Sequence, residues 1–352
     1  MIFRLLAIVR EIEMEISVEK LKDLIKKIEN AKILVVGDLA LDEMVYGDTE
    51  RISREAPVLI LQHTHTKYIL GGASNAAHNV SAINGGKVSV VGVVGDDYQA
   101  QDLKNAFNEA GIDCSSLITD KERKTITKTR ISGACSQSIT QQIVRIDRQT
   151  NAPISKETEE KIINEVVKLI PNYDAVILSD YHIGTLSDNI IRAVIDTAKK
   201  YSKIVIVDAQ KDLNRYKGVY SMTPNLPDTQ KHVGYYLRTK EDFVKAGQKL
   251  ITDTGAENVL ITCGSEGIVV VEKDNKYSHI PVFNKSKVFD VTGAGDTVTA
   301  TFTLALAIGA EPVYAAIIGN IAAGIVIKQY GCATTNIDEI LASTPAKILV
   351  EN

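Results

Sequence analysis

The stretch VFDVTGAGDTVTA, residues 288–300, joins three small residues, Gly293, Ala294 and Gly295, to Asp296 and then to an apolar run of helical length. A helix N-terminus has N–H groups without intrahelical partners and a partial positive charge, so it favours an anion. Glycine lets that anion approach the backbone without a Cβ in the way. A carboxylate beside such a cradle suits phosphoryl transfer, in which an aspartate accepts the proton of the attacking hydroxyl. The simpler alternative is a strand-to-helix turn with a capping aspartate.

The composition narrows the class of protein. Of the 352 residues, 45% are hydrophobic and 24% are charged, which is typical of a globular protein with a full core. The net charge of −4 offers no basic field for nucleic acid or an anionic membrane, so we expect neither as a partner. No C-x-x-C pair occurs among Cys114, Cys135, Cys263 and Cys332. This pattern indicates a reduced, cytoplasmic protein without disulfides or a zinc site.

Residues 1–31 are predicted to form an N-terminal extension that ends in a helix. The apolar run over residues 5–9 is too short for a signal peptide or a membrane span. Residues 18–30 carry Leu21, Leu24 and Ile28 at helical spacing, and this spacing predicts an amphipathic surface helix before the first strand.

From residue 32 onward, predicted strands and helices alternate. Short apolar runs predict strands over residues 32–38, 87–97, 173–181, 203–210, 218–225 and 257–264. Amphipathic runs predict helices over residues 157–169, 187–201 and 239–253. This rhythm predicts a mostly parallel sheet with helices on both faces, and a ligand site beyond the carboxyl ends of its strands. The polar residues expected at that edge are Asp38, Asp180, Asp208, Asn225 and Thr262.

Two stretches interrupt the alternation. Residues 45–70 and 124–147 alternate apolar with polar residues and are rich in Thr, Ile and Val, which predicts antiparallel strands. We interpret them as a small β-strand lid over the active edge. With no internal repeat or linker between them, residues 32–345 are expected to form one domain with a lid.

With these elements in place, residues 32 to 340 resemble the ribokinase-like (phosphofructokinase-B type) carbohydrate kinases. The string DVTGAGD matches that family's C-terminal signature, in which the aspartate is the general base and the preceding amides form the anion hole. The resemblance implies a three-layer α/β/α sandwich. It also implies a kinase that uses ATP and Mg²⁺, and it leaves room for a monovalent cation near Gly331 and Cys332.

The same resemblance assigns roles to other residues. GGASNAAHN (71–79) matches the glycine pair and the Asn that line the family's sugar pocket, and GDLALD (37–42) matches its acceptor of a sugar hydroxyl. LSDYHIGTL (178–186) is similar to the heptose 7-phosphate kinases of this family. The substrate-binding residues expected from these matches are Asp42, Gly71, Gly72, Asn75 and Asp180. TPNLPD (223–228) matches an Asn-x-x-Glu element near magnesium, with Asp228 at the Glu position. TCGSEG (262–267) resembles the nucleotide loop, so the nucleotide-binding residues implied are Asn225, Thr262, Gly264, Gly267 and Asn320.

Within the family, the string RISREAPV (51–58) is similar to the flap of the heptose 7-phosphate kinases. This similarity implies phosphorylation of the anomeric hydroxyl of D-glycero-D-manno-heptose 7-phosphate. Three positions depart from that pattern, because Arg54, Ile183 and Gln210 replace the usual Pro, Lys and Lys. The flap cations expected to bind a sugar phosphate instead are Arg51 above all, with Arg54, Lys128, Arg130 and Arg145. We expect no fused nucleotidyltransferase, since the chain ends soon after the kinase pattern and Thr185 replaces the second histidine that such an enzyme needs.

Other functions stay open at this point. A kinase for another sugar or a nucleoside fits the same motifs, and a non-catalytic relative that binds a sugar or nucleotide fits the departures. A dinucleotide-dependent oxidoreductase fits an α/β sheet but needs a G-x-G-x-x-G string, which VVGDLALD (35–42) lacks. We expect a homodimer that associates through the lid.

Overall fold

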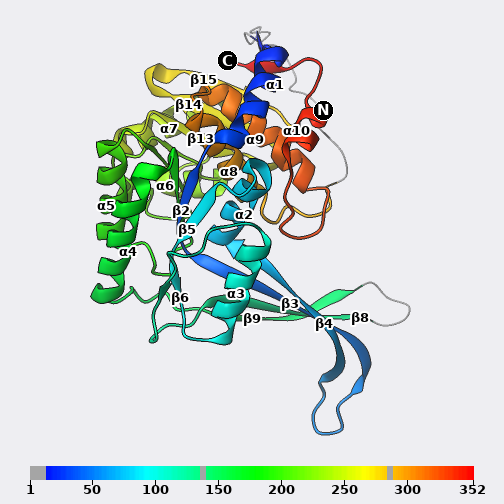
Figure 1. Ribbon diagram of the computed structural model, residues 1–352. Coiled ribbons are helices and arrows are strands. Elements are labelled where there is room, and N and C mark those ends of the chain that lie inside the picture. Colours follow the sequence, from blue (N-terminus) through cyan, green and yellow to red (C-terminus); the bar gives the residue numbers. More distant parts are fainter. Residues whose placement is uncertain (1–12, 135–139, 284–287) are drawn as a thin grey trace.

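The computed structural model describes residues 13–134, 140–283 and 288–352 (Figure 1). Its central sheet has the strand order β1-β16-β15-β14-β13-β12-β11-β10-β2-β5. The parallel part comprises β5 (Val88–Val91), β2 (Ile33–Gly37), β10 (Ala175–Asp180), β11 (Ile204–Ala209), β12 (Ser221–Met222) and β13 (Asn258–Thr262). The antiparallel part comprises β14 (Ile268–Glu272), β15 (Tyr277–Ile280), β16 (Leu349–Glu351) and β1 (Glu13–Glu15). The prediction of a mostly parallel sheet is confirmed.

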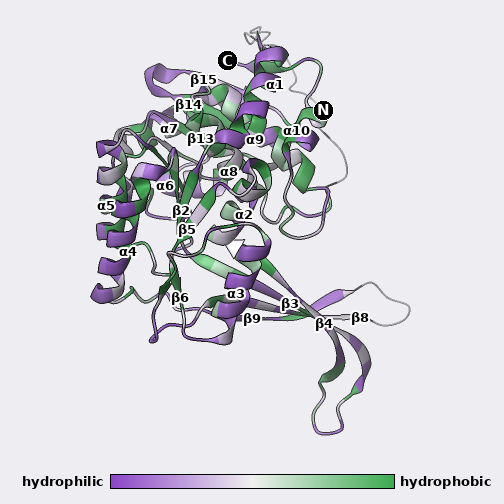
Figure 2. Ribbon diagram, in the orientation of Figure 1, coloured by the Kyte–Doolittle hydropathy of each residue, from purple (hydrophilic) through white to green (hydrophobic). Residues whose placement is uncertain are grey.

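Helices cover both faces of this sheet. One layer contains α1 (Val18–Lys27), α2 (Ala73–Asn84), α3 (Tyr98–Glu109), α8 (Ala294–Ala307), α9 (Pro312–Val326) and α10 (Ile337–Ser343). The other contains α4 (Lys156–Leu169), α5 (Asp188–Lys200), α6 (Leu226–Val233) and α7 (Lys240–Thr254). Successive side chains of a strand point to opposite faces, so Ile33 and Val35 join the first core while Leu34 and Val36 join the second. The fold is therefore the three-layer sandwich predicted above, and Figure 2 shows green and purple residues alternating along α4 and α5.

The lid is a separate four-stranded sheet with the order β4-β3-β8-β9. It consists of β3 (Leu39–Ile52), β4 (Leu59–Gly72), β8 (Ile126–Ala134) and β9 (Gln141–Arg148). β3 follows β2 after the single residue Asp38, and the far end of the β3–β4 hairpin projects away from the helices (Figure 1). The expectation of purely antiparallel strands was wrong for one pair, because β3 and β8 run parallel. The remaining described strands, β6 (Val93–Val94) and β7 (Ile118–Thr119), form a short parallel pair.

Several local predictions differ in detail. The strand expected over 218–225 shortens to β12, and the one over 87–97 divides into β5 and β6. α1 begins after Ser17, whose side chain accepts the Lys20 N–H, and β1 pairs with the C-terminal strand β16. The apolar run over 5–9 and Cys135 lie outside the described residues. The three described cysteines are free thiols, and no helix in the described ranges is long and apolar enough to cross a membrane.

Candidate active site

The N-terminus of α8 lies at the carboxyl end of the parallel strands. Gly293 caps the helix with a φ of 80°, the left-handed region that glycine favours. A Cβ at this position would lie only 2.7 Å from the Asn75 Nδ2 atom. At Gly295, by contrast, a Cβ would meet nothing within 4 Å. The Ala294 N–H donates to the Val291 carbonyl, so within the described residues the N–H groups of Gly295 and Asp296 are the ones in this turn left open to an anion.

Asp296, in that same turn, is held by two donors from distant parts of the chain. Its Oδ2 accepts a hydrogen bond of 2.6 Å from Asn75 Nδ2, and its Oδ1 accepts one of 3.0 Å from the Tyr181 hydroxyl. Asn79 continues the network, because it donates to the Asn75 carbonyl and accepts from Thr297. Burial raises the pKa of Asp296 to about 6, and the two donors oppose that rise. The carboxylate is thus ionised at neutral pH and able to accept a proton.

A cavity of about 400 Å³ opens in front of Asp296. Its lining includes Asp208, Asp228 and Thr262, together with Gly293 and Gly295. Burial, followed by the neighbouring charge of Asp296, raises the pKa of Asp208 to about 8, so Asp208 is the protonated member of this acidic pair at neutral pH. A larger hollow of about 570 Å³ lies on the lid and is lined mainly by aliphatic and aromatic side chains. The smaller, polar cavity is the candidate site because it contains the ionisable groups.

On the lid side, Asp42 completes the surroundings of Asp296. Asp42 is buried, and the Arg130 Nη1 atom lies 2.7 Å from its Oδ1. That contact lacks hydrogen-bond geometry, and no other partner within the described residues reaches Oδ1. A Cβ at Gly71 would approach the Asp42 carboxyl group to 3.0 Å. Gly71 therefore packs directly against the Asp42 carboxylate, and a larger residue there would push that carboxylate aside.

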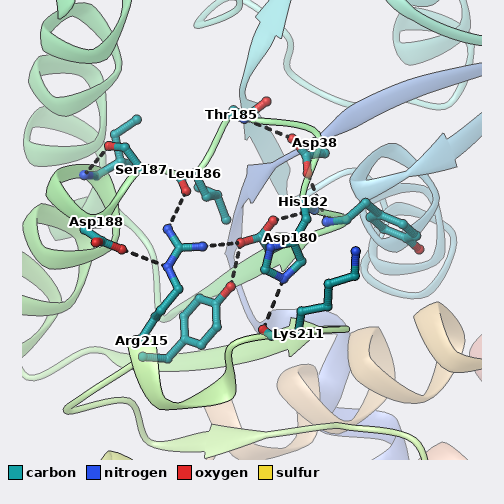
Figure 3. Close-up of polar contacts among 12 residues, drawn as sticks. Asp38, Asp180, His182, Thr185, Leu186, Ser187, Asp188, Lys211 and Arg215 are labelled. Carbon is teal, nitrogen blue, oxygen red and sulfur yellow. Dashed lines mark hydrogen bonds and ion pairs between the residues drawn. The ribbon is translucent and has the colours of Figure 1, made fainter. Parts of the chain in front are cut away.

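Asp180 and Asp38 fix the turn that follows β10 (Figure 3). Asp180 accepts hydrogen bonds from Tyr216, Arg215 and the His182 N–H at 2.6, 3.4 and 2.7 Å. These contacts engage both of its oxygens, and its role as a substrate ligand stays a prediction. At position 72 the backbone itself requires glycine. Its φ is 55°, and a Cβ there would lie 2.7 Å from the Asp38 carbonyl oxygen.

Of the residues predicted to bind a nucleotide, Asn225 and Thr262 line the cavity. Asn225 caps α6 by accepting the Asp228 N–H at 2.8 Å, and it bridges to Thr262 at the end of β13. Gly267 has a φ of 93°, and a Cβ there would lie 2.1 Å from the Ile280 carbonyl oxygen. Gly264, with a φ of 58°, opens the same loop. Asn320 donates to the Pro281 carbonyl at 2.8 Å, so its amide ties α9 to the segment after β15.

Comparison with known proteins identifies the family to which a chain with this site belongs. The model of the "pfkB family carbohydrate kinase" matches residues 17–339. The chain belongs to the pfkB family of carbohydrate kinases. It is therefore a kinase, and the oxidoreductase alternative is excluded.

Two bifunctional HldE proteins are similar to this pfkB kinase. The protein from Geobacter metallireducens is 39% identical over 311 residues, which is 88% of this chain and 62% of that one. The protein from Helicobacter hepaticus is 38% identical over 314 residues, which is 89% of this chain and 64% of that one. The chain thus spans less than two thirds of the length of these curated relatives.

Solved structures show the same fold. Arabidopsis thaliana ribokinase complexed with ribose and ATP superposes with a TM-score of 0.67 at 19% identity, covering 89% of this chain and 98% of that one. Escherichia coli phosphofructokinase-2 with substrates and products gives 0.72 at 17% identity, covering 89% and 99%.

Arg51, the flap cation expected above all to bind a sugar phosphate, lies away from the site of this pfkB kinase. It is exposed near the far end of β3, nine residues beyond Asp42. At a rise of about 3.3 Å per residue, the two are at most about 30 Å apart along the strand. Arg51 thus lies toward the tip of the lid, and its role as a phosphate ligand stays a prediction. Lys128 and Arg130 of β8 are the cations beside the site, and Lys128 lies directly opposite Asp42 in the lid sheet.

Proposed function

We propose that this pfkB kinase transfers the γ-phosphoryl group of ATP to the anomeric hydroxyl of D-glycero-D-manno-heptose 7-phosphate. The observation that carries the proposal is the position of Asp296, between the open helix N-terminus of α8 and the sugar-side groups Asp42 and Asn75. The flap string RISREAPV and the similarity to the HldE proteins support the heptose assignment.

The chemistry follows from this arrangement. The acceptor oxygen attacks the γ-phosphorus, a new O–P bond forms, and the bond from the γ-phosphorus to the bridging oxygen of ADP breaks. Asp296 takes the proton of the acceptor hydroxyl, while the N–H groups at the start of α8 stabilise the charge on the transferred group. Asp42 accepts a hydrogen bond from another hydroxyl of the sugar and so orients the ring. The cytoplasm, where ATP is abundant, is the expected place of action.

The oxygen ligands in the cavity fit magnesium. Within the described residues, no three acidic, histidine or cysteine side chains lie close enough to hold a metal ion alone. Magnesium in kinases commonly binds one or two carboxylates together with substrate phosphates and water. Asp228 would supply that carboxylate, and the ion would neutralise the phosphates of ATP.

Asp228→Ala should raise the magnesium concentration needed for half-maximal activity several-fold, because the ion would lose its protein carboxylate. The measurement is a magnesium titration at saturating ATP and sugar. Asp274→Ala, an exposed acidic residue on the segment between β14 and β15, is the matched control and should leave the titration unchanged. An unchanged magnesium requirement in Asp228→Ala would show that Asp228 does not bind the ion and only stabilises the first turn of α6.

We also propose a monovalent cation beside the anion-binding turn. Asp290 joins the two loops there, since it accepts the N–H groups of Thr292 and Gly331 at 2.9 and 3.0 Å. A carboxylate and loop carbonyls at one junction suit such an ion. Activity is therefore to be measured with and without potassium.

The lid supports the proposal of a homodimer. Its outer face exposes Leu59, Ile143 and Val144 at 49, 45 and 44%, around the apolar hollow described above. Aliphatic side chains gathered in this way on one face of a sheet mark an interaction surface, and a second copy of the same lid is the partner whose apolar face matches it.

Ile143→Asp should convert a dimer to a monomer at micromolar concentration, because it places a charge in the buried part of that interface. Sedimentation velocity measures the mass. Glu109→Lys, at the exposed end of α3, controls for a change of charge away from the lid. A wild-type protein that sediments as a monomer would contradict the proposal.

The substrate assignment is tested by ADP release across a panel of sugars, nucleosides and sugar phosphates. We expect the highest kcat/KM with the 7-phosphorylated heptose. A higher kcat/KM with a nucleoside or an unphosphorylated sugar would contradict the heptose assignment and identify the protein as a pfkB kinase for that other acceptor. No turnover with any acceptor would contradict the kinase proposal itself.

A further inference from the structure

Tyr181 is a residue to which the sequence patterns assigned no role. It directly follows β10, and its hydroxyl donates to Asp296 Oδ1 at 3.0 Å. The Lys128 ammonium lies 5.6 Å from the centre of its ring. Because Asn75 donates to the other oxygen, each oxygen of the Asp296 carboxylate has one fixed donor. Each also retains a lone pair that can accept a substrate hydroxyl.

The backbone under Tyr181 is fixed by Asp38, which is completely buried between β2 and β3. The Asp38 carboxylate accepts the N–H groups of Tyr181, Ile183 and Thr185 at 2.9, 3.1 and 3.2 Å. Figure 3 shows the contact between Asp38 and Thr185. Three backbone donors on one carboxylate hold this turn as a rigid unit.

The opposite side of the same turn is held as well. Arg123 donates to the Ile183 carbonyl at 2.8 Å, and the His182 N–H donates to Asp180. His182 itself has a φ of 57°, a conformation that non-glycine residues seldom adopt unless the surroundings impose it. The position of the Tyr181 hydroxyl is therefore set by the protein before any substrate arrives.

The electrostatic surroundings explain why such a donor matters. Three acidic groups face Asp296: Asp42 from β3, Asp208 from β11 and Cys332 after α9. One positive charge faces it as well, the Lys128 ammonium from β8. Burial raises the pKa of Asp296, and the Tyr181 hydrogen bond lowers it. Burial also raises the pKa of Tyr181 well above 10, so its hydroxyl remains a donor throughout the working pH range.

We infer that Tyr181 is a positioning residue: it fixes the direction of the Asp296 carboxylate and stabilises its charged form, so that the carboxylate can take the proton of the acceptor hydroxyl. This inference rests on the proposed function for the identity of the reaction. It adds a residue outside the glycine-rich turn to the machinery that prepares the base.

Tyr181→Phe tests the inference, since it removes one oxygen and keeps the ring. The acid limb of the kcat profile should move upward by about one pH unit, because a hydrogen bond to a charged group is worth at least that shift. Near pH 6 the rate should fall about fivefold, because the charged fraction of Asp296 drops from about one half to about one tenth. Near pH 8.5 it should return to within about twofold of wild type. The KM for the sugar should change little. Tyr173→Phe is the matched control, because its hydroxyl donates to Ser89 outside the cavity.

The pH profile separates positioning from structure. A uniform loss at every pH, or a profile identical to wild type, would overturn the inference. The profile is measured with whichever acceptor the panel identifies, so it does not depend on the heptose assignment.

A second measurement needs no turnover at all. Carbon-13 NMR of labelled aspartate carboxyls, with the Asp296 signal identified by its absence in Asp296→Asn, should show Asp296 titrating at higher pH in Tyr181→Phe. An unchanged titration would overturn the inference even if the protein were active. A shifted titration in a protein inactive on every acceptor would support Tyr181 while contradicting the proposed function.

Discussion

Asp296→Asn is expected to lower kcat by roughly 10²–10⁴-fold, the range usual for loss of a general base. The amide keeps the size of the side chain and can still contact Asn75 and Tyr181, but it cannot accept a proton. The KM for ATP should change little, because the nucleotide contacts proposed for this chain are the helix N-terminus and the loops around Asn225 and Thr262. Steady-state kinetics near pH 7, with ATP binding measured by calorimetry, gives both quantities.

Asp208→Asn is the matched control for this experiment. Asp208 lines the same cavity, and its raised pKa leaves it protonated at neutral pH, so the substitution replaces one neutral side chain by another. Its effect should be roughly tenfold or smaller. Equal losses in the two variants, or near wild-type turnover in Asp296→Asn, would remove Asp296 from the role of base.

Lys128→Met is expected to weaken the phosphorylated sugar by about 10- to 150-fold, which corresponds to a charge-assisted hydrogen bond of about 1.5–3 kcal/mol. In the described part of the chain, no carboxylate lies within ion-pair distance of the Lys128 ammonium, whereas Arg130 is paired with Asp42. Of the two β8 cations beside Asp42, Lys128 is therefore the one available to a substrate phosphate. Methionine keeps the length of the side chain and removes only the charge.

The comparison of two sugars decides what Lys128 does. If it binds the distal phosphate, kcat/KM should fall for the 7-phosphorylated heptose and stay nearly constant for the same heptose without phosphate. Lys124→Ala, an exposed residue just before β8, removes the same charge outside the site and should affect neither sugar. If Lys128→Met lowers kcat/KM equally for both sugars, the Lys128 ammonium does not bind the distal phosphate, and it would instead contact the transferred phosphoryl group.

The sandwich could be predicted from the sequence because apolar runs and amphipathic helices follow from local periodicity. The predicted helices over 157–169, 187–201 and 239–253 appear as α4, α5 and α7, with boundaries that shift by at most one residue. The pairing of β1 with β16 joins three residues near one end of the chain to three near the other. Such long-range pairing leaves no local signal, and neither does the parallel alignment of β3 with β8.

At the site, the sequence identified the turn around Asp296, whereas the choice among the lid cations stays a prediction. Arg51 belongs to a telling string, yet its distance from Asp42 depends on how far β3 continues as one strand. Tyr181 was missed because a tyrosine after a buried strand also fits a packing role. Its position beside Asp180, at the carboxyl end of a parallel strand, was the one available signal.

Phosphorus-31 NMR of the reaction products tests the central claim most directly. With wild-type protein, Mg-ATP and the 7-phosphorylated heptose, we expect ADP and one new phosphate signal in equal amounts, with the new phosphate coupled to the anomeric proton. A new phosphate on another carbon would contradict the assigned acceptor, and release of inorganic phosphate with an unchanged sugar would contradict the proposed phosphoryl transfer.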